Sequence, residues 1–145
     1  MADFIFLIGP GGAGKSTVGA FLAARLGYAC ADLDDAFCTH VSTVFILSSG
    51  FLATDIRPDI VEQNRDRVQR AGLSVLLLPS RDYHEALSCI VARQLKRGFG
   101  LKRESEIAKF DQRFSQYLCL GDVQIFSMDA PEVIAAHLAN VLSGQ

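Results

Sequence analysis

The fold is decided by the stretch Gly9-Pro10-Gly11-Gly12-Ala13-Gly14-Lys15-Ser16, which fits the pattern G-x-x-x-x-G-K-[ST]. An apolar run enters this stretch, and a segment with helical periodicity leaves it. Glycines let successive backbone N–H groups turn toward a phosphate, and a helix N-terminus adds partial positive charge. The stretch therefore predicts a phosphate-binding loop (P-loop) for a nucleoside triphosphate. The residues expected to contact the nucleotide here are Gly9, Gly11, Gly12, Ala13, Gly14, Lys15, Ser16 and Thr17.

Within this loop, two side chains carry specific expectations. The Lys15 ammonium is expected to reach the β- and γ-phosphates and to act in catalysis. The Ser16 hydroxyl is expected to ligate Mg²⁺.

Outward from the loop, short apolar runs alternate with helical periodicity, which is typical of a parallel sheet with helices on both faces. We expect a three-layer α/β fold of the P-loop NTPase type, with a five-stranded parallel sheet, formed by residues 1–145 as a single domain. The run Val41 to Leu47 should be a central strand, buried on both faces, because it is continuously apolar and β-branched. Ser80 is expected to cap the helix that begins near Tyr83, and Asp129 with Glu132 to form a capping box for the last helix. The expected strands are 4–8, 28–32, 41–47, 73–78 and 123–127, and the first helix is expected at about 15–26.

The composition bounds the class of protein. The chain has 145 residues, half of them hydrophobic, and a formal net charge of -2. No apolar stretch approaches the roughly 18–20 residues that span a bilayer, so no membrane partner is expected. The charge argues against a large electropositive face, so no nucleic acid is expected. The four scattered cysteines indicate neither a zinc site nor a disulfide framework, and we expect a cytoplasmic monomer.

The nucleotide is expected to be ATP. A GTPase would carry an Asn-Lys-x-Asp guanine reader, and the nearest string, Ala108 to Asp111, lacks the Asn. An ATPase motor would end a buried strand in an acidic pair, whereas Phe45 to Leu47 runs into Ser48-Ser49-Gly50. Neither class is indicated.

Two carboxylates follow the expected second strand as Asp32-Leu33-Asp34. Open α/β sheets place their ligands at the carboxyl ends of strands. Side chains two residues apart on an extended segment point the same way, so both can face the γ-phosphate. Asp32 is expected to hold magnesium through water, and Asp34 to accept a proton from an attacking hydroxyl. The alternative for this segment is a solvated acidic turn.

Together these residues resemble the shikimate kinase family of small P-loop kinases. The resemblance covers Gly9 to Thr17, the helix containing Leu22 to Gly27, Asp32-Leu33-Asp34, and the chain from Val44 onward. It implies transfer of the γ-phosphoryl group of Mg·ATP to a hydroxyl of a small metabolite.

The resemblance also implies roles for residues outside the loop. Arg93 and Pro131 would contact adenine, and Arg97 would close over the transferring phosphoryl group. Arg113 would pair with a carboxylate of the substrate, a task that suits its bidentate guanidinium. The substrate would lie against Asp34, Ser49, Gly50 and Arg113. For the arginines, the alternative is a solvated helix face.

Two departures from the family pattern affect the acceptor site. Ser48-Ser49-Gly50 replaces a triple-glycine substrate loop. The family's substrate-binding helices should lie between Asp34 and Val44, where few residues stand, and parallel neighbouring strands need a crossover of about a dozen or more residues. We therefore hypothesise that a segment is missing from the sequence near residues 38–41. The alternative is a natural deletion, which would truncate the substrate site. A lid is expected around residues 97–105.

The sequence thus favours an ATP-dependent kinase that acts on a small, carboxylate-bearing hydroxyl acceptor, with shikimate as the implied acceptor. A gluconate-type sugar-acid kinase is an alternative within the same class. A P-loop protein that binds nucleotide without kinase activity is the alternative from another class.

Overall fold

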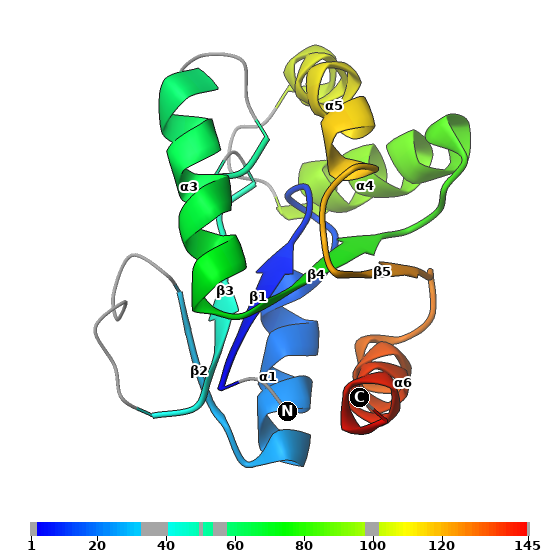
Figure 1. The fold of residues 1–145 in the computed structure, drawn as a ribbon. Coiled ribbons are helices and arrows are strands. Elements are labelled where there is room, and N and C mark those ends of the chain that lie inside the picture. The colour runs from blue at the N-terminus through cyan, green and yellow to red at the C-terminus, as the bar shows by residue number, and fades with distance from the viewer. Residues whose placement is uncertain (1–2, 33–40, 50, 54–57, 98–101, 145) are drawn as a thin grey trace.

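The computed structural model describes residues 3–32, 41–49, 51–53, 58–97 and 102–144 of the chain. Within them, five strands form one sheet in the order β2-β3-β1-β4-β5, and every neighbouring pair is parallel (Figure 1). The strands are β1 (Phe4–Ile8), β2 (Ala29–Asp32), β3 (Thr43–Ile46), β4 (Leu73–Leu78) and β5 (Val123–Phe126). The predicted five-stranded parallel sheet is confirmed.

The interior strands are buried on both faces because their sequences are continuously apolar. Every residue of β3 is buried, and so is every residue of β1 and β4 except the first. The β3 strand lies between β2 and β1, so it is an interior strand, but the central position predicted for residues 41–47 is wrong because β1 occupies it.

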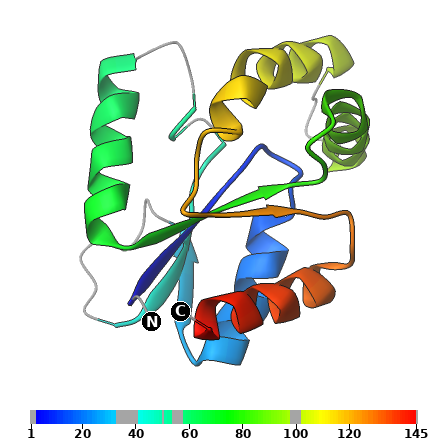
Figure 2. The same ribbon diagram turned by 45° about the vertical axis from the view of Figure 1, so that its right-hand side comes forward.

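Five helices flank the sheet among the described residues. They are α1 (Lys15–Leu26), α3 (Pro58–Ala71), α4 (Tyr83–Arg97), α5 (Arg103–Tyr117) and α6 (Pro131–Ser143). The α1 and α6 helices pack together on one side of the sheet, and α3, α4 and α5 lie on the other (Figures 1 and 2). This is the predicted three-layer α/β arrangement. No helix within the described ranges is long and apolar enough to cross a bilayer.

The α1 helix lies very close to the sheet at Gly19. An added Cβ at this position would lie 2.4 Å from Ile46 Cδ1 and 3.2 Å from Leu7 Cδ1. The absence of a side chain therefore lets the helix backbone approach β1 and β3. This contact sets the start of α1 beside the carboxyl end of β1, where the P-loop lies.

Two predicted helix caps are wrong. Asp82, and not Ser80, caps α4, since its carboxylate accepts a hydrogen bond from the Glu85 amide at 2.9 Å. Ser80 acts one step earlier, because its hydroxyl accepts from the Asp82 amide at 3.0 Å. At α6 the N-cap is Ala130, without a side-chain hydrogen bond, and Pro131 occupies the first turn. Proline is pre-organised for that position, so no capping box is needed there.

The hypothesis of a missing segment near residues 38–41 falls largely outside the described residues. The flanking strands β2 and β3 are parallel neighbours, as the hypothesis assumed. Residues 33–40 of their connection lie outside the described residues, as do residues 98–101 of the expected lid. The missing segment and the lid both stay predictions.

Gly121 should be required where the chain enters β5 and packs against β4. Its φ is +92°, and an added Cβ would lie 2.8 Å from the Val123 carbonyl oxygen and 2.9 Å from the Leu76 amide nitrogen. We expect Gly121→Ala to lower the free energy of unfolding by about 1–3 kcal/mol, because backbone strain of this kind costs that much. Urea denaturation measures it.

Gly144→Ala is the matched control for that experiment. Gly144 has a φ of -81°, and an added Cβ there would meet no atom closer than 3.6 Å. An equal loss of stability in the two variants would contradict the assignment of strain to Gly121.

Candidate functional site

The glycine-rich loop joins β1 to α1 with a tight internal turn. The Ala13 amide donates a hydrogen bond to the Pro10 carbonyl oxygen at 3.1 Å. Gly12 and Gly14 have φ values of +85° and +88°, a region that L side chains rarely adopt. Gly14 is also the N-cap of α1. The predicted sequence of strand, glycine loop and helix is therefore present.

The N-terminus of α1 is electrostatically prepared for an anion. The first N–H groups of a helix have no partner within the helix, and they carry the positive end of its dipole. Gly14 offers no capping side chain, and the first turn of α1 contains no acidic residue. Each of the other described helices has an acidic residue in its first turn. In α1, therefore, no acidic residue of the first turn offsets the positive end of the helix dipole.

Lys15 adds a buried cation at the same place. Its side chain folds back over the loop, and Nζ donates to the Gly9 carbonyl oxygen at 2.5 Å. Burial, with a smaller contribution from repulsion by the nearby Arg97 and Arg113 guanidinium groups, lowers the pKa of Lys15 from 10.5 to about 8. A polyphosphate would relieve this repulsion, so the ammonium is held where an anion is needed.

A cavity of about 710 Å³ opens in front of the loop. It brings together most of the residues that the sequence singled out. The predicted residues on its lining are Gly11, Gly12, Gly14, Lys15, Ser16, Thr17, Asp32, Ser49, Arg93 and Arg97. Gly9, Ala13 and Pro131 are not among the described lining residues. Gly9 instead lies against β4, since a Cβ there would be 2.4 Å from the Leu77 carbonyl oxygen.

Ser16 and Asp32 are the predicted magnesium pair, and both line the cavity. A hydroxyl and a carboxylate are hard oxygen donors, which suit Mg²⁺. No cluster of three or more His, Cys, Asp or Glu able to hold a metal occurs in the described part of the chain. This donor set fits a cation that keeps several waters and binds phosphate oxygens, as Mg²⁺ does in nucleotide sites. Asp34 and Gly50 lie outside the described residues.

The α4 helix presents two arginines to the loop. Arg93 Nη1 donates to the Gly12 carbonyl oxygen at 3.0 Å, so in this structure its guanidinium braces the loop. Arg97, one turn later, is an exposed residue that lines the cavity. Its Nη1 donates to Gln94 Oε1 at 2.9 Å.

Arg113 and Tyr117 of α5 converge on Ser49. Arg113 Nη1 donates to Ser49 Oγ at 3.3 Å, and the Tyr117 hydroxyl donates to the Ser49 carbonyl oxygen at 2.7 Å. Burial raises the pKa of Tyr117 to about 12, against the opposing effect of Arg113, so the hydroxyl stays a donor. Arg113 lines a smaller neighbouring cavity of about 30 Å³, which shares Gly11, Ser49 and Gln94 with the larger one.

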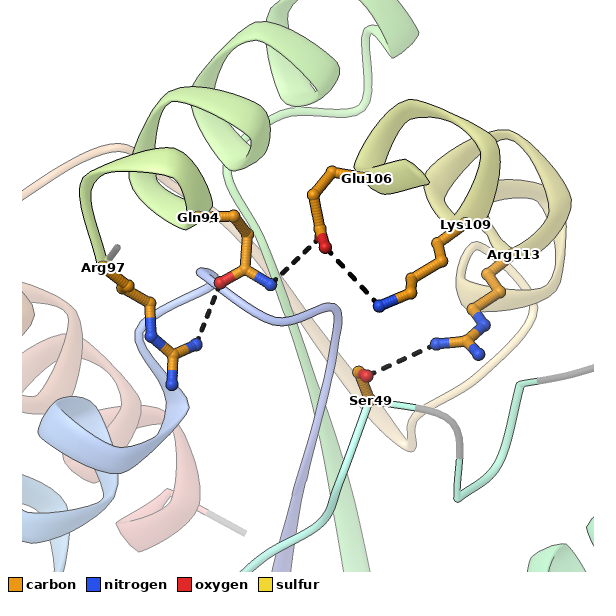
Figure 3. A network of polar contacts seen from close by, with 6 residues as sticks. All are labelled: Ser49, Gln94, Arg97, Glu106, Lys109 and Arg113. Carbon is orange, nitrogen blue, oxygen red and sulfur yellow. Dashed lines mark hydrogen bonds and ion pairs between the residues drawn. The ribbon is translucent and has the colours of Figure 1, made fainter. Parts of the chain in front are cut away.

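The sequence reasoning missed Gln94 and Glu106. Both side chains are buried, and they join Arg97 to α5 through hydrogen bonds (Figure 3). Gln94 follows Ala86 and Ile90 at intervals of four, on the buried stripe of α4. A polar residue on an apolar helical stripe was the available signal. Glu106 lies in the first turn of α5, where acidic residues are common, so no signal in the sequence singled it out.

Comparisons with known proteins come from sequence and from fold. No family model matches the chain. The curated shikimate kinase of Methylococcus capsulatus is 36% identical over 107 residues, which cover 64% of this chain. The match spans 60% of the length of that relative.

Solved structures share the fold over nearly the whole chain. Shikimate kinase from Acinetobacter baumannii, solved in complex with shikimate, has a TM-score of 0.75 at 18% identity, with 98% of this chain and 94% of that chain covered. Shikimate kinase from Bacteroides thetaiotaomicron has a TM-score of 0.70 at 18% identity, with 99% of each chain covered. A gluconokinase from Sinorhizobium meliloti has a TM-score of 0.51 at 17% identity, with 97% and 95% covered. The chain therefore shares its fold with these solved structures, and the sequence match supports the resemblance to shikimate kinases.

Proposed function

We propose that this protein is a magnesium- and ATP-dependent kinase that transfers the γ-phosphoryl group to a hydroxyl of a small, carboxylate-bearing metabolite. One observation carries the proposal. The uncapped N-terminus of α1, the buried Lys15 ammonium and the oxygen pair of Ser16 and Asp32 face a single cavity. Cationic donors beside hard oxygen ligands are the combination that a metal-bound polyphosphate requires.

The proposed reaction depends on positioning and on charge neutralisation. The acceptor oxygen attacks the γ-phosphorus, the bond to the β–γ bridging oxygen breaks, and ADP leaves. The hydroxyl proton passes to the Asp34 carboxylate, the base in this proposal. The amides of the loop and Lys15 bind the β- and γ-phosphate oxygens, and Arg97 stabilises charge on the transferring group. When bound, Mg²⁺ would neutralise charge on the β- and γ-oxygens beside Ser16 and Asp32.

A carboxylate-bearing acceptor is favoured by the guanidinium of Arg113, which lines the smaller cavity beside the loop. Arg113 is placed by Ser49 of the segment after β3, and its Nε atom is buried without a hydrogen-bond partner among the described residues. A guanidinium in that state attracts a carboxylate. Shikimate is the first acceptor to test, because it is bound in the Acinetobacter baumannii structure. Gluconate is the second, because the sugar-acid kinase shares the fold more distantly.

The rival function is nucleotide binding without transfer. It is motivated by Ser48 and Ser49 after β3, where the resembling family carries glycines. This function predicts that the protein binds nucleotide in the same cavity but has no functional site for an acceptor.

Release of ADP with shikimate, with gluconate and without acceptor separates the two functions. We expect turnover of Mg·ATP to rise strongly on addition of one hydroxy acid, and Lys15→Met to reduce that turnover by at least about 100-fold, since such charge-stabilising groups contribute on that scale. The control is Lys96→Met, which removes an exposed lysine of α4, and this variant should stay active. Nucleotide binding without acceptor-stimulated turnover would support the rival, and full activity of Lys15→Met would refute the proposed mechanism.

Nucleotide binding should weaken as the pH rises through about 8. Lys15 in the free protein has a pKa of about 8, so its charge is lost above that pH. Because the bound polyphosphate favours the ammonium, the dissociation constant for Mg·ATP should increase up to about tenfold per pH unit between pH 8 and 9.5. Calorimetric titrations at a series of pH values measure this dependence.

Lys15→Met should remove that pH dependence, while Lys96→Met should keep it. The linkage has the opposite sign for folding. The unfolded state binds the Lys15 proton up to about pH 10.5, so this group makes unfolding less favourable as the pH rises above 8. The titration of Lys15 therefore does not unfold the protein above pH 8, and weaker binding in that range reports the loss of the Lys15 charge. An affinity for Mg·ATP that does not change with pH in the parent protein would contradict the account.

A further inference from the structure

A chain of hydrogen bonds runs from α5 to the phosphate cavity. Glu106 on α5 accepts a hydrogen bond at Oε2 from Gln94 Nε2 at 3.3 Å, and Gln94 Oε1 accepts one from Arg97 Nη1 at 2.9 Å (Figure 3). Gln94 and Glu106 are 8% and 5% exposed. Lys109 Nζ lies 3.5 Å from the second oxygen of Glu106, so the buried carboxylate has a cationic partner.

The order of donors and acceptors in this chain allows one orientation of the Gln94 amide. A guanidinium can only donate, and an ionised carboxylate can only accept. The amide oxygen of Gln94 must therefore face Arg97, and its nitrogen must face Glu106. Reversing the amide would break both contacts and leave buried polar groups unpaired, which is costly.

The P-loop closes the other side of this amide. An added Cβ at Gly11 would lie 2.3 Å from Gln94 Nε2, so the amide occupies the space beside the glycine. Gln94 is thus fixed by the loop on one side and by α5 on another. Of the three residues Glu106, Gln94 and Arg97, Arg97 is the exposed one, and it lines the larger cavity.

We propose that Gln94 and Glu106 are positioning residues that hold the Arg97 guanidinium at the phosphate cavity, with Glu106 acting through the Gln94 amide. The inference rests on the proposed function in one respect, which is that Arg97 meets the γ-phosphate. It goes beyond that function in linking Arg97 to α5, the helix that also carries Arg113. A long arginine side chain loses much rotamer freedom when it binds phosphate, and an acceptor that holds it in advance reduces that loss.

The ratio of the dissociation constants for Mg·ADP and Mg·ATP isolates the contact with the γ-phosphate. We expect the parent protein to prefer ATP, and Arg97→Ala to reduce the preference by roughly tenfold or more, as expected for a hydrogen bond between charged groups. Gln94→Met keeps the volume of the side chain and removes its polar atoms. It should reduce the ratio by a similar factor in the parent protein, and should have no further effect in the Arg97→Ala background.

Glu106 provides the rescue test. Glu106→Gln keeps a carbonyl acceptor for the Gln94 amide nitrogen and should retain most of the ATP preference. Glu106→Met removes the acceptor and should lose the preference as Gln94→Met does. The control is Gln116→Met on the same helix, which removes an amide that bonds Arg65 and not the loop, and it should leave the ratio unchanged.

The outcomes distinguish this inference from the proposed function. Equal weakening of ADP and ATP binding by Gln94→Met would overturn the inference, because the residue would then act on the loop through Gly11. Additive effects of Gln94→Met and Arg97→Ala, or a parent protein without ATP preference, would overturn it as well. A parent protein that prefers ATP and follows the expected pattern, yet transfers no phosphoryl group to any acceptor, would support the inference and refute the kinase.

Discussion

The proposed function depends on one electrostatic constraint, which is the positive charge gathered at the start of α1 where a polyphosphate would bind. The amides at the helix start, the Lys15 ammonium and the nearby guanidinium groups all present positive charge to one cavity. Burial, together with repulsion from the Arg97 and Arg113 guanidinium groups, lowers the pKa of Lys15 to about 8 when no anion is bound. Folding therefore assembles a cluster of positive charge that a bound anion would neutralise. The hydrophobic packing around the cluster supplies the stability that keeps it together.

That packing explains how a small domain holds the cluster in place. The interior strands are buried on both faces, and Gly19 lets α1 approach β1 and β3 closely. On the opposite side, α4 braces the loop from outside through Arg93 and Gln94. The α5 helix reaches Ser49 through Arg113 and Tyr117, beside the expected acceptor site. The expected nucleotide side and the expected acceptor side of the cavity are thus joined through the packed helices α4 and α5.

The fold could be predicted from the sequence because its signals are local. The apolar runs, the glycine loop and the helical stripes each specify one element, and together they gave the sheet and the helices correctly. The caps of α4 and α6 were wrong because Asp82 and Ser80 compete for the same turn, and because Pro131 begins α6 without a capping side chain. Gln94 and Glu106 were missed because their roles arise from contact between α4, α5 and the loop. Arg93 donates to the Gly12 carbonyl oxygen, a contact that its position on the helix did not reveal.

The most direct test of the account is a crystal structure of the protein with Mg²⁺ and a non-hydrolysable ATP analogue. The account requires the β-phosphate oxygens to lie within hydrogen-bond distance, about 2.7–3.2 Å, of the backbone amides at the start of α1, with Lys15 Nζ on the β- and γ-phosphates. It also requires the metal to lie beside Ser16 and Asp32. A nucleotide bound elsewhere, or one whose phosphates avoid the helix start, would contradict it.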